Sequence, residues 1–322
     1  MPLLTYRNKS MHETKQPPAA KQSSPRPTLA ELSRHCQKPD HRRVGNWMAC
    51  WIARPLALLV TWAILPAGIS AHTMTLLAWL TACCSAAAFA WGSSAGWVMG
   101  AILLQLWYLL DHVDGQLARY QGTASLDGAT LDYLMHHWVN LTLPLAIGWG
   151  LYSHHFNVLW FLLGLSWGLG ALFIGLYHDA RYKSFIQRLK RVDGILQTHG
   201  GGGGRPTPPA SVPWREPARW PGYFARKLCE PHVQLNLLTL TAFLQLYYSD
   251  STLVLARLHL LCLSLIAPTV SALQIRHGLL TSASETEFSR WHTPPSGHTL
   301  HYQAAHGTWT LHPSRSPNSH AA

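Results

Sequence analysis

Long apolar stretches alternate with polar segments along the chain. The hydrocarbon core of a bilayer is about 30 Å thick and needs roughly 20 helical residues to cross it. Six stretches come close to that length and lie at residues 73–92, 95–113, 128–151, 156–176, 233–249 and 252–274. The pattern therefore predicts an all-α, polytopic membrane protein with six transmembrane helices.

A further apolar run precedes these six, at residues 46–70. Arg54 and Pro55 interrupt it near its start, and Pro66 and Gly68 interrupt it near its end. Such a run can lie in the membrane interface as an amphipathic helix or form a short span. We predict an interfacial amphipathic helix that precedes the six spans.

The remaining segments have the composition of tails and linkers. Residues 1–45 are polar, basic and proline-containing, and they cannot bury enough apolar area to offset the entropy of ordering, so we expect a disordered tail. Residues 46–275 are expected to form the membrane domain, with a Gly- and Pro-rich cytoplasmic linker at about 192–222. Residues 276–322 are rich in His, Pro and Ser and are expected to form a second disordered tail.

The distribution of charge predicts the orientation. The 322 residues include 25 Lys and Arg but only 14 Asp and Glu, which gives a net charge of +11. The short connections "GSSAG", "YSHHFN" and "SDS" contain no Lys or Arg, whereas the N-terminal region, residues 178–232 and the C-terminal tail hold nearly all of them. Because cytoplasmic loops are the basic ones, we expect an integral protein of the cytoplasmic (inner) membrane with both termini cytoplasmic. The basic residues follow this topology, so nucleic acid is not an expected partner.

Acidic residues lie at the predicted cytoplasmic ends of the second and third spans. Asp111 and Asp114 are three residues apart, and Asp132 and His136 are four apart, so each pair shares a helix face. A carboxylate at bilayer depth costs roughly 2.5 to 3.5 kcal/mol, so three of them require a compensating partner. A hard divalent cation such as Mg²⁺ is a natural partner, because it prefers carboxylate oxygens and keeps positions open for phosphate.

Small and basic residues separate the two pairs. Gly115 and Ala118 permit close approach of a ligand, and Arg119 offers a fork of donors for phosphate oxygens. These residues together describe a pocket for a pyrophosphate bridged by metal. The alternative is an interfacial salt-bridge cluster that closes a helical turn.

The spacing of these residues resembles a known signature. The CDP-alcohol phosphotransferase (CDP-alcohol phosphatidyltransferase) family has DxxDG, two residues, AR, about eight residues and then GxxxDxxxD. Residues 68–77, "GISAHTMTLL", look more weakly like the family's "ISPNxxT" entry to the first span. The similarity covers about residues 46–275. Seven of the eight fixed positions match in register: Asp111, Asp114, Gly115, Ala118, Arg119, Gly128 and Asp132.

One position departs from the signature. The family's fourth aspartate, its general base, is replaced by His136, and His137 follows it. Histidine can transfer a proton, because its unperturbed pKa of about 6.5 lies near operating pH. It is a poorer ligand for Mg²⁺ than an oxygen, so the metal preference can shift toward Mn²⁺.

The resemblance implies transfer of a substituted phosphate group from a CDP-alcohol, with CDP-diacylglycerol as the expected donor, to an acceptor alcohol. CMP would be released, in phospholipid or related biosynthesis. The resemblance also implies a homodimer in contact with membrane lipids. No motif identifies the acceptor. The open alternatives are a catalytically altered or inactive family member that acts as a membrane scaffold, and a transporter that uses intramembrane acids as an ion relay.

The implied site residues follow from the matched positions. His136 is the expected catalytic base. The expected CDP-binding residues are Asp111, Gly115, Ala118, Arg119 and Gly128. The expected ligands of Mg²⁺ or Mn²⁺ are Asp111, Asp114, Asp132 and His136. Asp127 is expected to cap the N-terminus of the third span.

Overall fold

The computed structural model describes residues 26–37, 45–198, 213–248 and 252–313. The chain is mostly helical, with ten α-helices in the described residues. The α-helices are α1 (Leu29–Cys36), α2 (Arg54–Ile64), α3 (Ala71–Ala90), α4 (Ser94–Gln121), α5 (Leu126–His155), α6 (Val158–Leu189), α7 (Trp220–Leu228), α8 (Pro231–Tyr247), α9 (Val254–Leu280) and α10 (Ala283–Trp291).

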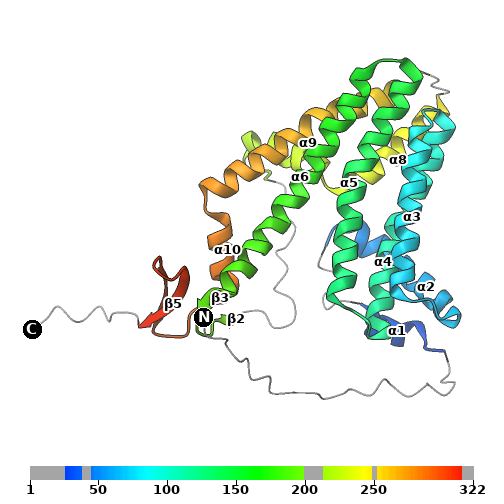
Figure 1. Ribbon diagram of the computed structural model, residues 1–322. Helices are drawn as coiled ribbons and strands as arrows, with labels where there is room; N and C mark the ends of the chain where they lie inside the picture. Colours follow the sequence, from blue (N-terminus) through cyan, green and yellow to red (C-terminus); the bar gives the residue numbers. More distant parts are fainter. Residues whose placement is uncertain (1–25, 38–44, 199–212, 249–251, 314–322) are drawn as a thin grey trace, which may run out of the picture.

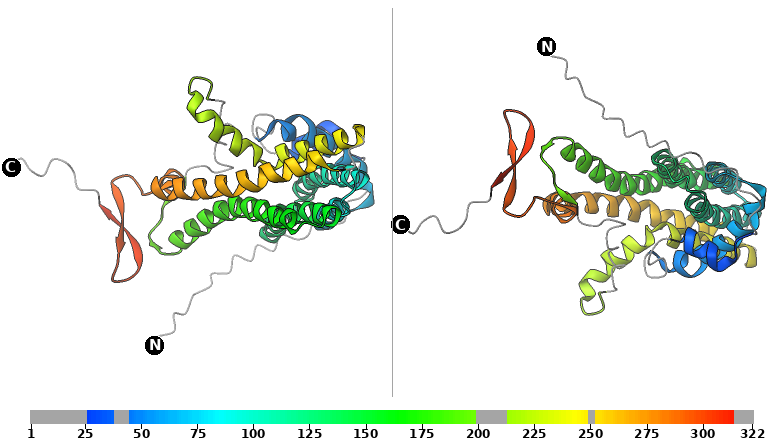
Figure 2. Two further views of the ribbon diagram at one scale, coloured as in Figure 1. Left: turned by 90° about the horizontal axis from the view of Figure 1, so that it is seen from above. Right: turned by 90° about the horizontal axis from the view of Figure 1, so that it is seen from below.

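The long helices α3, α4, α5, α6, α8 and α9 form a bundle (Figure 1). Contacts join α3 to α4 and α5, α5 to α6, α6 to α9, and α4 to α8. Helices α1 and α2 pack against the C-terminal half of α4 at one end of the bundle. Helix α7 projects from the side of the bundle in both views of Figure 2. The bundle therefore brings the turn between α4 and α5 close to α1 and α2.

Each of the six predicted spans coincides with one of the long helices. Four helical segments are long and apolar enough to cross a membrane: Ala49–Ala67, α3, α6 and α9. The first of them is the segment predicted as an interfacial helix, and it is continuous from a π-helical turn (Ala49–Ala53) through α2 to a 3-10 turn (Leu65–Ala67). Helices α4, α5 and α8 are not among these four; α4 and α5 carry the acidic residues, and α8 has 17 residues.

Glycines allow close crossing of the bundle helices. Gly148 of α5 faces Gly164 of α6, where a Cβ on either residue would lie 3.0 Å from the other's Cα. Gly170 of α6 faces Pro268 of α9, where a Cβ would lie 2.4 Å from the proline nitrogen. Helices in a bilayer associate through such small residues because lipid gives no hydrophobic drive between apolar helices. The glycines thus explain how three long helices stay in close contact.

The turn between α4 and α5 is fixed by local chemistry. Gly122 ends α4 in the left-handed region with φ 66°, and the Thr123 amide donates to the Ala118 carbonyl at 2.9 Å. The Ser125 hydroxyl then accepts from the Gly128 amide at 3.0 Å and caps α5. The predicted cap, Asp127, is wrong: it lies in the first turn of α5, where its charge still suits the helix dipole. This tight turn places the last turns of α4 beside the first turns of α5.

Regular elements also occur within both predicted tails. Helix α1 lies in the N-terminal one, α10 and three short strands lie in the C-terminal one, and two further strands lie in the predicted linker. The strands form a three-stranded sheet in the order β1 (Val192–Asp193), β5 (Thr308–Pro313), β4 (His298–Gln303), and a pair of β2 (Gln197–Thr198) with β3 (His292–Thr293). The protein is thus mostly helical rather than all-α. Residues 199–212 of the predicted linker lie outside the described residues.

Candidate active site

A cavity of about 340 Å³ lies between the last turns of α4, the first turns of α5, the start of α3 and helices α1 and α2. Seven signature residues line it: Asp111, Asp114, Gly115, Ala118, Arg119, Gly128 and Asp132. They share one wall because the tight turn after Gln121 folds the two helix faces toward each other. The structure therefore brings together the residues that the sequence singled out, apart from His136, which does not line the cavity.

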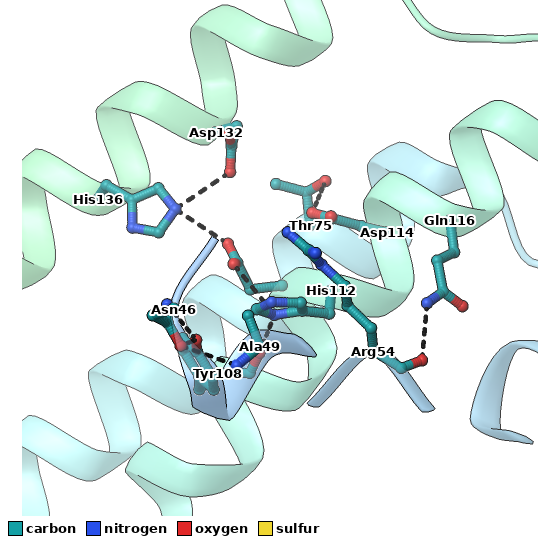
Figure 3. A network of polar contacts seen from close by, with 11 residues as sticks. Asn46, Ala49, Arg54, Thr75, Tyr108, His112, Asp114, Gln116, Asp132 and His136 are labelled. Carbon is teal, nitrogen blue, oxygen red and sulfur yellow. Dashed lines mark hydrogen bonds and ion pairs between the residues drawn. The ribbon is translucent and has the colours of Figure 1, made fainter. Parts of the chain in front are cut away.

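His136 lies next to this cavity and contacts two of its carboxylates. Its Nε2 atom is 3.1 Å from Asp111 Oδ1 and 3.4 Å from Asp132 Oδ1. Figure 3 shows its imidazole directed toward the Asp132 side chain. The Trp107 ring packs edge-on against the imidazole, with the ring centroids 5.7 Å apart. The histidine is thus held between an aromatic wall and two acids, with 37% of its side chain exposed.

Three of the four predicted ligands can reach one cation. One oxygen each of Asp111 and Asp132 and one nitrogen of His136 all lie within 4.8 Å of one another. Asp111 Oδ1 is buried and, apart from its ion-pair contact with His136, has no hydrogen-bond partner among the described residues. A buried carboxylate oxygen that contacts only one imidazole nitrogen is still costly to bury, and a divalent cation would offset that cost. The residues present therefore fit a divalent metal.

Asp114, the fourth predicted ligand, lies outside this group. Its Oδ2 atom accepts a hydrogen bond from the Thr75 hydroxyl at 2.7 Å (Figure 3). The side chains of Asp114 and Thr75 are both buried at the cavity wall. Thr75 therefore fixes one oxygen of Asp114 and leaves the other for a ligand in the cavity.

The phosphate-binding residues expected from the sequence lie on the same wall. A Cβ added at Gly115 would lie 3.4 Å from Nη1 and 3.8 Å from Nη2 of Arg119, so both terminal nitrogens lie beside this glycine. A Cβ added at Gly128 would lie 3.2 Å from Ser125 Oγ and 3.9 Å from His72 Nε2. The wall thus combines a guanidinium with backbone that a ligand can approach.

Several cavity residues were not expected from the signature. Arg54 of α2 and His112 of α4 line the cavity, and Gln116 donates from Nε2 to the Arg54 carbonyl at 3.0 Å (Figure 3). His112 Nδ1 lies 2.9 Å from the Tyr108 carbonyl and 3.8 Å from Asp111 Oδ2. Arg54 had one signal in the sequence, a charge inside an apolar run. For His112, Gln116 and Gln37, which also lines the cavity, we find no such signal.

Comparison with known proteins supports the resemblance. Residues 52–191 match the family described as CDP-alcohol phosphatidyltransferase, and this segment contains every signature residue. The sequence has no match among curated proteins. Among solved structures, the fold is similar to the crystal structure of Mycobacterium tuberculosis phosphatidylinositol phosphate synthase (PgsA1) with CDP-DAG bound. The identity is 17% and the TM-score 0.48, over 71% of this chain and 94% of that one. The resemblance inferred from the signature is thus confirmed over residues 52–191.

Proposed function

We propose that the protein, whose residues 52–191 form a CDP-alcohol phosphatidyltransferase domain, transfers the phosphatidyl group of CDP-diacylglycerol to an acceptor alcohol and releases CMP. The observation that carries this proposal is the convergence of Asp111, Asp132 and His136 beside a cavity lined by the other signature residues. Three acids around a cavity of this size suit a metal-bridged pyrophosphate better than a closed salt-bridge cluster.

The proposed reaction forms one bond to phosphorus and breaks another, and the acceptor's hydroxyl proton passes to His136. The acceptor hydroxyl oxygen attacks the β-phosphorus, the bond from that phosphorus to the CMP oxygen breaks, and CMP leaves with the electron pair. A bound Mg²⁺ or Mn²⁺ would neutralise charge on the pyrophosphate and the leaving group. Asp111 and Asp132 would hold the ion, with Asp114 oriented by Thr75 as a further oxygen ligand.

Arg119 and the two glycines would bind the donor. The Arg119 guanidinium presents Nη1 and Nη2 beside Gly115, where a phosphate oxygen can accept from both. Gly128 leaves room at the N-terminus of α5, whose amides and dipole favour an anion. Ala118, between Gly115 and Arg119 on the cavity wall, adds no bulk.

His136 has two candidate roles, metal ligand and general base. A neutral imidazole has one lone pair, so it cannot ligate the ion and accept the hydroxyl proton in the same state. The contacts of Nε2 with Asp111 and Asp132 are attractive when Nε2 carries a hydrogen, which leaves the lone pair on Nδ1. We therefore propose that His136 is the base, and that the aspartates are the ligands.

The membrane arrangement proposed here has six spans and a preceding interfacial helix, with the active site and both termini on the cytoplasmic side. The acids lie at the ends of α4 and α5 that meet in one turn, rather than near the middle of several helices. That placement favours an enzyme at the membrane surface over a transporter with an ion relay. We expect a homodimer packed through membrane helices.

The test is release of CMP by the purified protein in detergent, with CDP-diacylglycerol, a panel of acceptor alcohols, and Mg²⁺ or Mn²⁺. Wild-type protein should release CMP, and Asp111→Asn should not. Asp127→Asn is the matched control, because Asp127 is an exposed acid on α5 that does not line the cavity. Absence of CMP release from wild-type protein across all acceptors, with CDP still bound, would favour a scaffold that has lost activity through the His136 substitution.

A further inference from the structure

Helix α1 reaches the cavity from outside the matched domain. The family match begins at residue 52, whereas α1 spans Leu29–Cys36. Gln37, the residue after α1, nevertheless lines the cavity together with the signature residues. The cavity is therefore completed by a part of the chain that does not belong to the matched domain.

The sequence of α1 explains why it forms and where it packs. Thr28 and Glu31 make a capping box, in which the Glu31 amide donates to the Thr28 hydroxyl at 3.3 Å and Glu31 Oε2 accepts from the Thr28 amide at 2.8 Å. Leu32 and Cys36 lie four residues apart on one face, and neither is exposed to solvent. This face packs against α2 and α4.

A second contact holds the start of α1 on α2. The Arg26 guanidinium lies 3.3 Å above the Trp62 ring centroid and donates to the Trp62 carbonyl. The Trp62 Nε1 atom in turn donates to the Pro27 carbonyl at 2.9 Å. The start of α1 is thus fixed to α2 of the matched domain.

The C-terminal end of α1 engages Arg119 directly. Cys36 is the last residue of the helix, so its carbonyl has no partner within α1. Arg119 Nε donates to this carbonyl. A cation at a helix C-terminus also gains from the helix dipole, so this contact suits a guanidinium.

This contact sets the direction of the rest of the guanidinium. With Nε committed to the Cys36 carbonyl, the planar group holds Nη1 and Nη2 together beside Gly115 on the cavity wall. Gln37 adds to the same region, where its Nε2 atom lies 3.5 Å from the Arg54 carbonyl. Loss of α1 docking would therefore release Arg119 to other rotamers and open one wall of the cavity.

We propose that α1 is a positioning element of the donor site, which orients Arg119 toward the pyrophosphate of a nucleotide diphosphate and closes the cavity with Gln37. This inference rests on the proposed function. It predicts that α1 strengthens donor binding through Arg119, and that the matched domain alone binds the nucleotide weakly.

The first measurement is equilibrium binding of CDP, with Mg²⁺ present, to the full-length protein in detergent. Leu32→Asp places a charge in the buried face and should undock α1, which should weaken CDP binding about tenfold through loss of the oriented guanidinium. Ala30→Asp introduces the same side chain on an exposed position of the same helix and should bind CDP as wild type does.

A double-mutant cycle with Arg119→Gln identifies the route of the effect. If α1 acts through Arg119, the double variant Leu32→Asp/Arg119→Gln should bind CDP as weakly as Arg119→Gln alone. Additive losses in the double variant would show that α1 acts elsewhere and would overturn the proposal. Tighter binding by Leu32→Asp would also overturn it, because α1 would then be withholding Arg119 from the ligand.

Alkylation of Cys36 reports docking without reference to activity. Burial raises the pKa of the Cys36 thiol to about 11, so the docked residue should react slowly with a maleimide. Peptide mass spectrometry should show rapid labelling of Cys36 in Leu32→Asp and slow labelling in Ala30→Asp. If Leu32→Asp exposes Cys36 and still binds CDP like wild type, the inference fails and the proposed function stands. If wild-type protein binds no CDP, the proposed function fails as well.

Discussion

His136 and His137 are neighbours on α5, yet they belong to two different regions of the molecule. His136 turns toward α4 and lies between Asp111 and Asp132 beside the cavity. His137 points about 100° away around the helix and contacts Asp179 of α6, with its Nε2 atom 2.7 Å from Asp179 Oδ2. The pairing of imidazole and carboxylate is the same in both.

The surroundings of the two pairs differ. The His136 pair has a second acid, Asp132, within 3.4 Å and an adjoining cavity. The Nδ1 atom of His137 is buried against Gly175 and has no hydrogen-bond partner among the described residues, so no ligand can reach it. In this molecule, open space and a second acid accompany only the pair at His136, which is why we propose chemistry there and not at His137. The other pair is a tether between α5 and α6.

The largest expected effect comes from the acids of the first region. Asp132→Asn removes a proposed metal ligand, and CMP release should fall by at least about 100-fold, as for loss of a transition-state charge partner. Its unfolding temperature in detergent should stay near the wild-type value, because 39% of the side chain is exposed. The exposed control Asp127→Asn should keep full activity. A normal rate for Asp132→Asn would place the metal elsewhere.

Substitution of His136 separates the roles of base and ligand. His136→Ala should lower turnover about 100-fold through loss of proton transfer, while the Mg²⁺ concentration for half-maximal activity stays unchanged. His136→Asp restores the family's residue and should keep or raise Mg²⁺-dependent turnover. Steady-state CMP release over a metal titration measures both quantities. A large rise in the Mg²⁺ requirement of His136→Ala would instead make His136 a ligand.

Thr75 gives a smaller expected effect. Thr75→Val keeps the shape of the side chain but removes the hydrogen bond to Asp114, and a residue that orients a metal ligand typically contributes 10- to 100-fold in metal affinity or activity. We expect about a tenfold increase in the Mn²⁺ concentration for half-maximal CMP release. Thr75→Ser, which keeps the hydroxyl, should behave like wild type. Equal metal requirements in both variants would show that the hydrogen bond from Thr75 to Asp114 does not support metal binding.

The sequence predicts the parts of the site that depend on local geometry. Asp111, Asp114 and Arg119 lie in the last turns of one helix, and the motif places Asp132 a short turn away in the next helix. Their spacing in the sequence is therefore sufficient to predict that they lie close together. The roles of the Cys36 carbonyl and Gln37 could not be predicted, because they depend on tertiary contacts with Arg119, 83 positions from Cys36, and with Arg54, 17 positions from Gln37. The spacing of four residues from Asp132, by contrast, already predicts that His136 rather than His137 faces the acids.

The smallest expected effect concerns the tether. His137→Ala should leave CMP release per folded molecule within about twofold and lower the free energy of unfolding by about 1 kcal/mol, since the hydrogen bond to Asp179 is partly exposed. Gly175→Ala offers an independent route, because a Cβ there would lie 2.8 Å from Cε1 and 3.0 Å from Nδ1 of His137 and would displace the ring. The His137→Ala variant lacks this ring, so the double variant His137→Ala/Gly175→Ala should have the same unfolding temperature as His137→Ala alone. A loss of activity larger than the loss of stability in His137→Ala would mean that the second pair also serves the reaction, and the distinction between the two regions would fail.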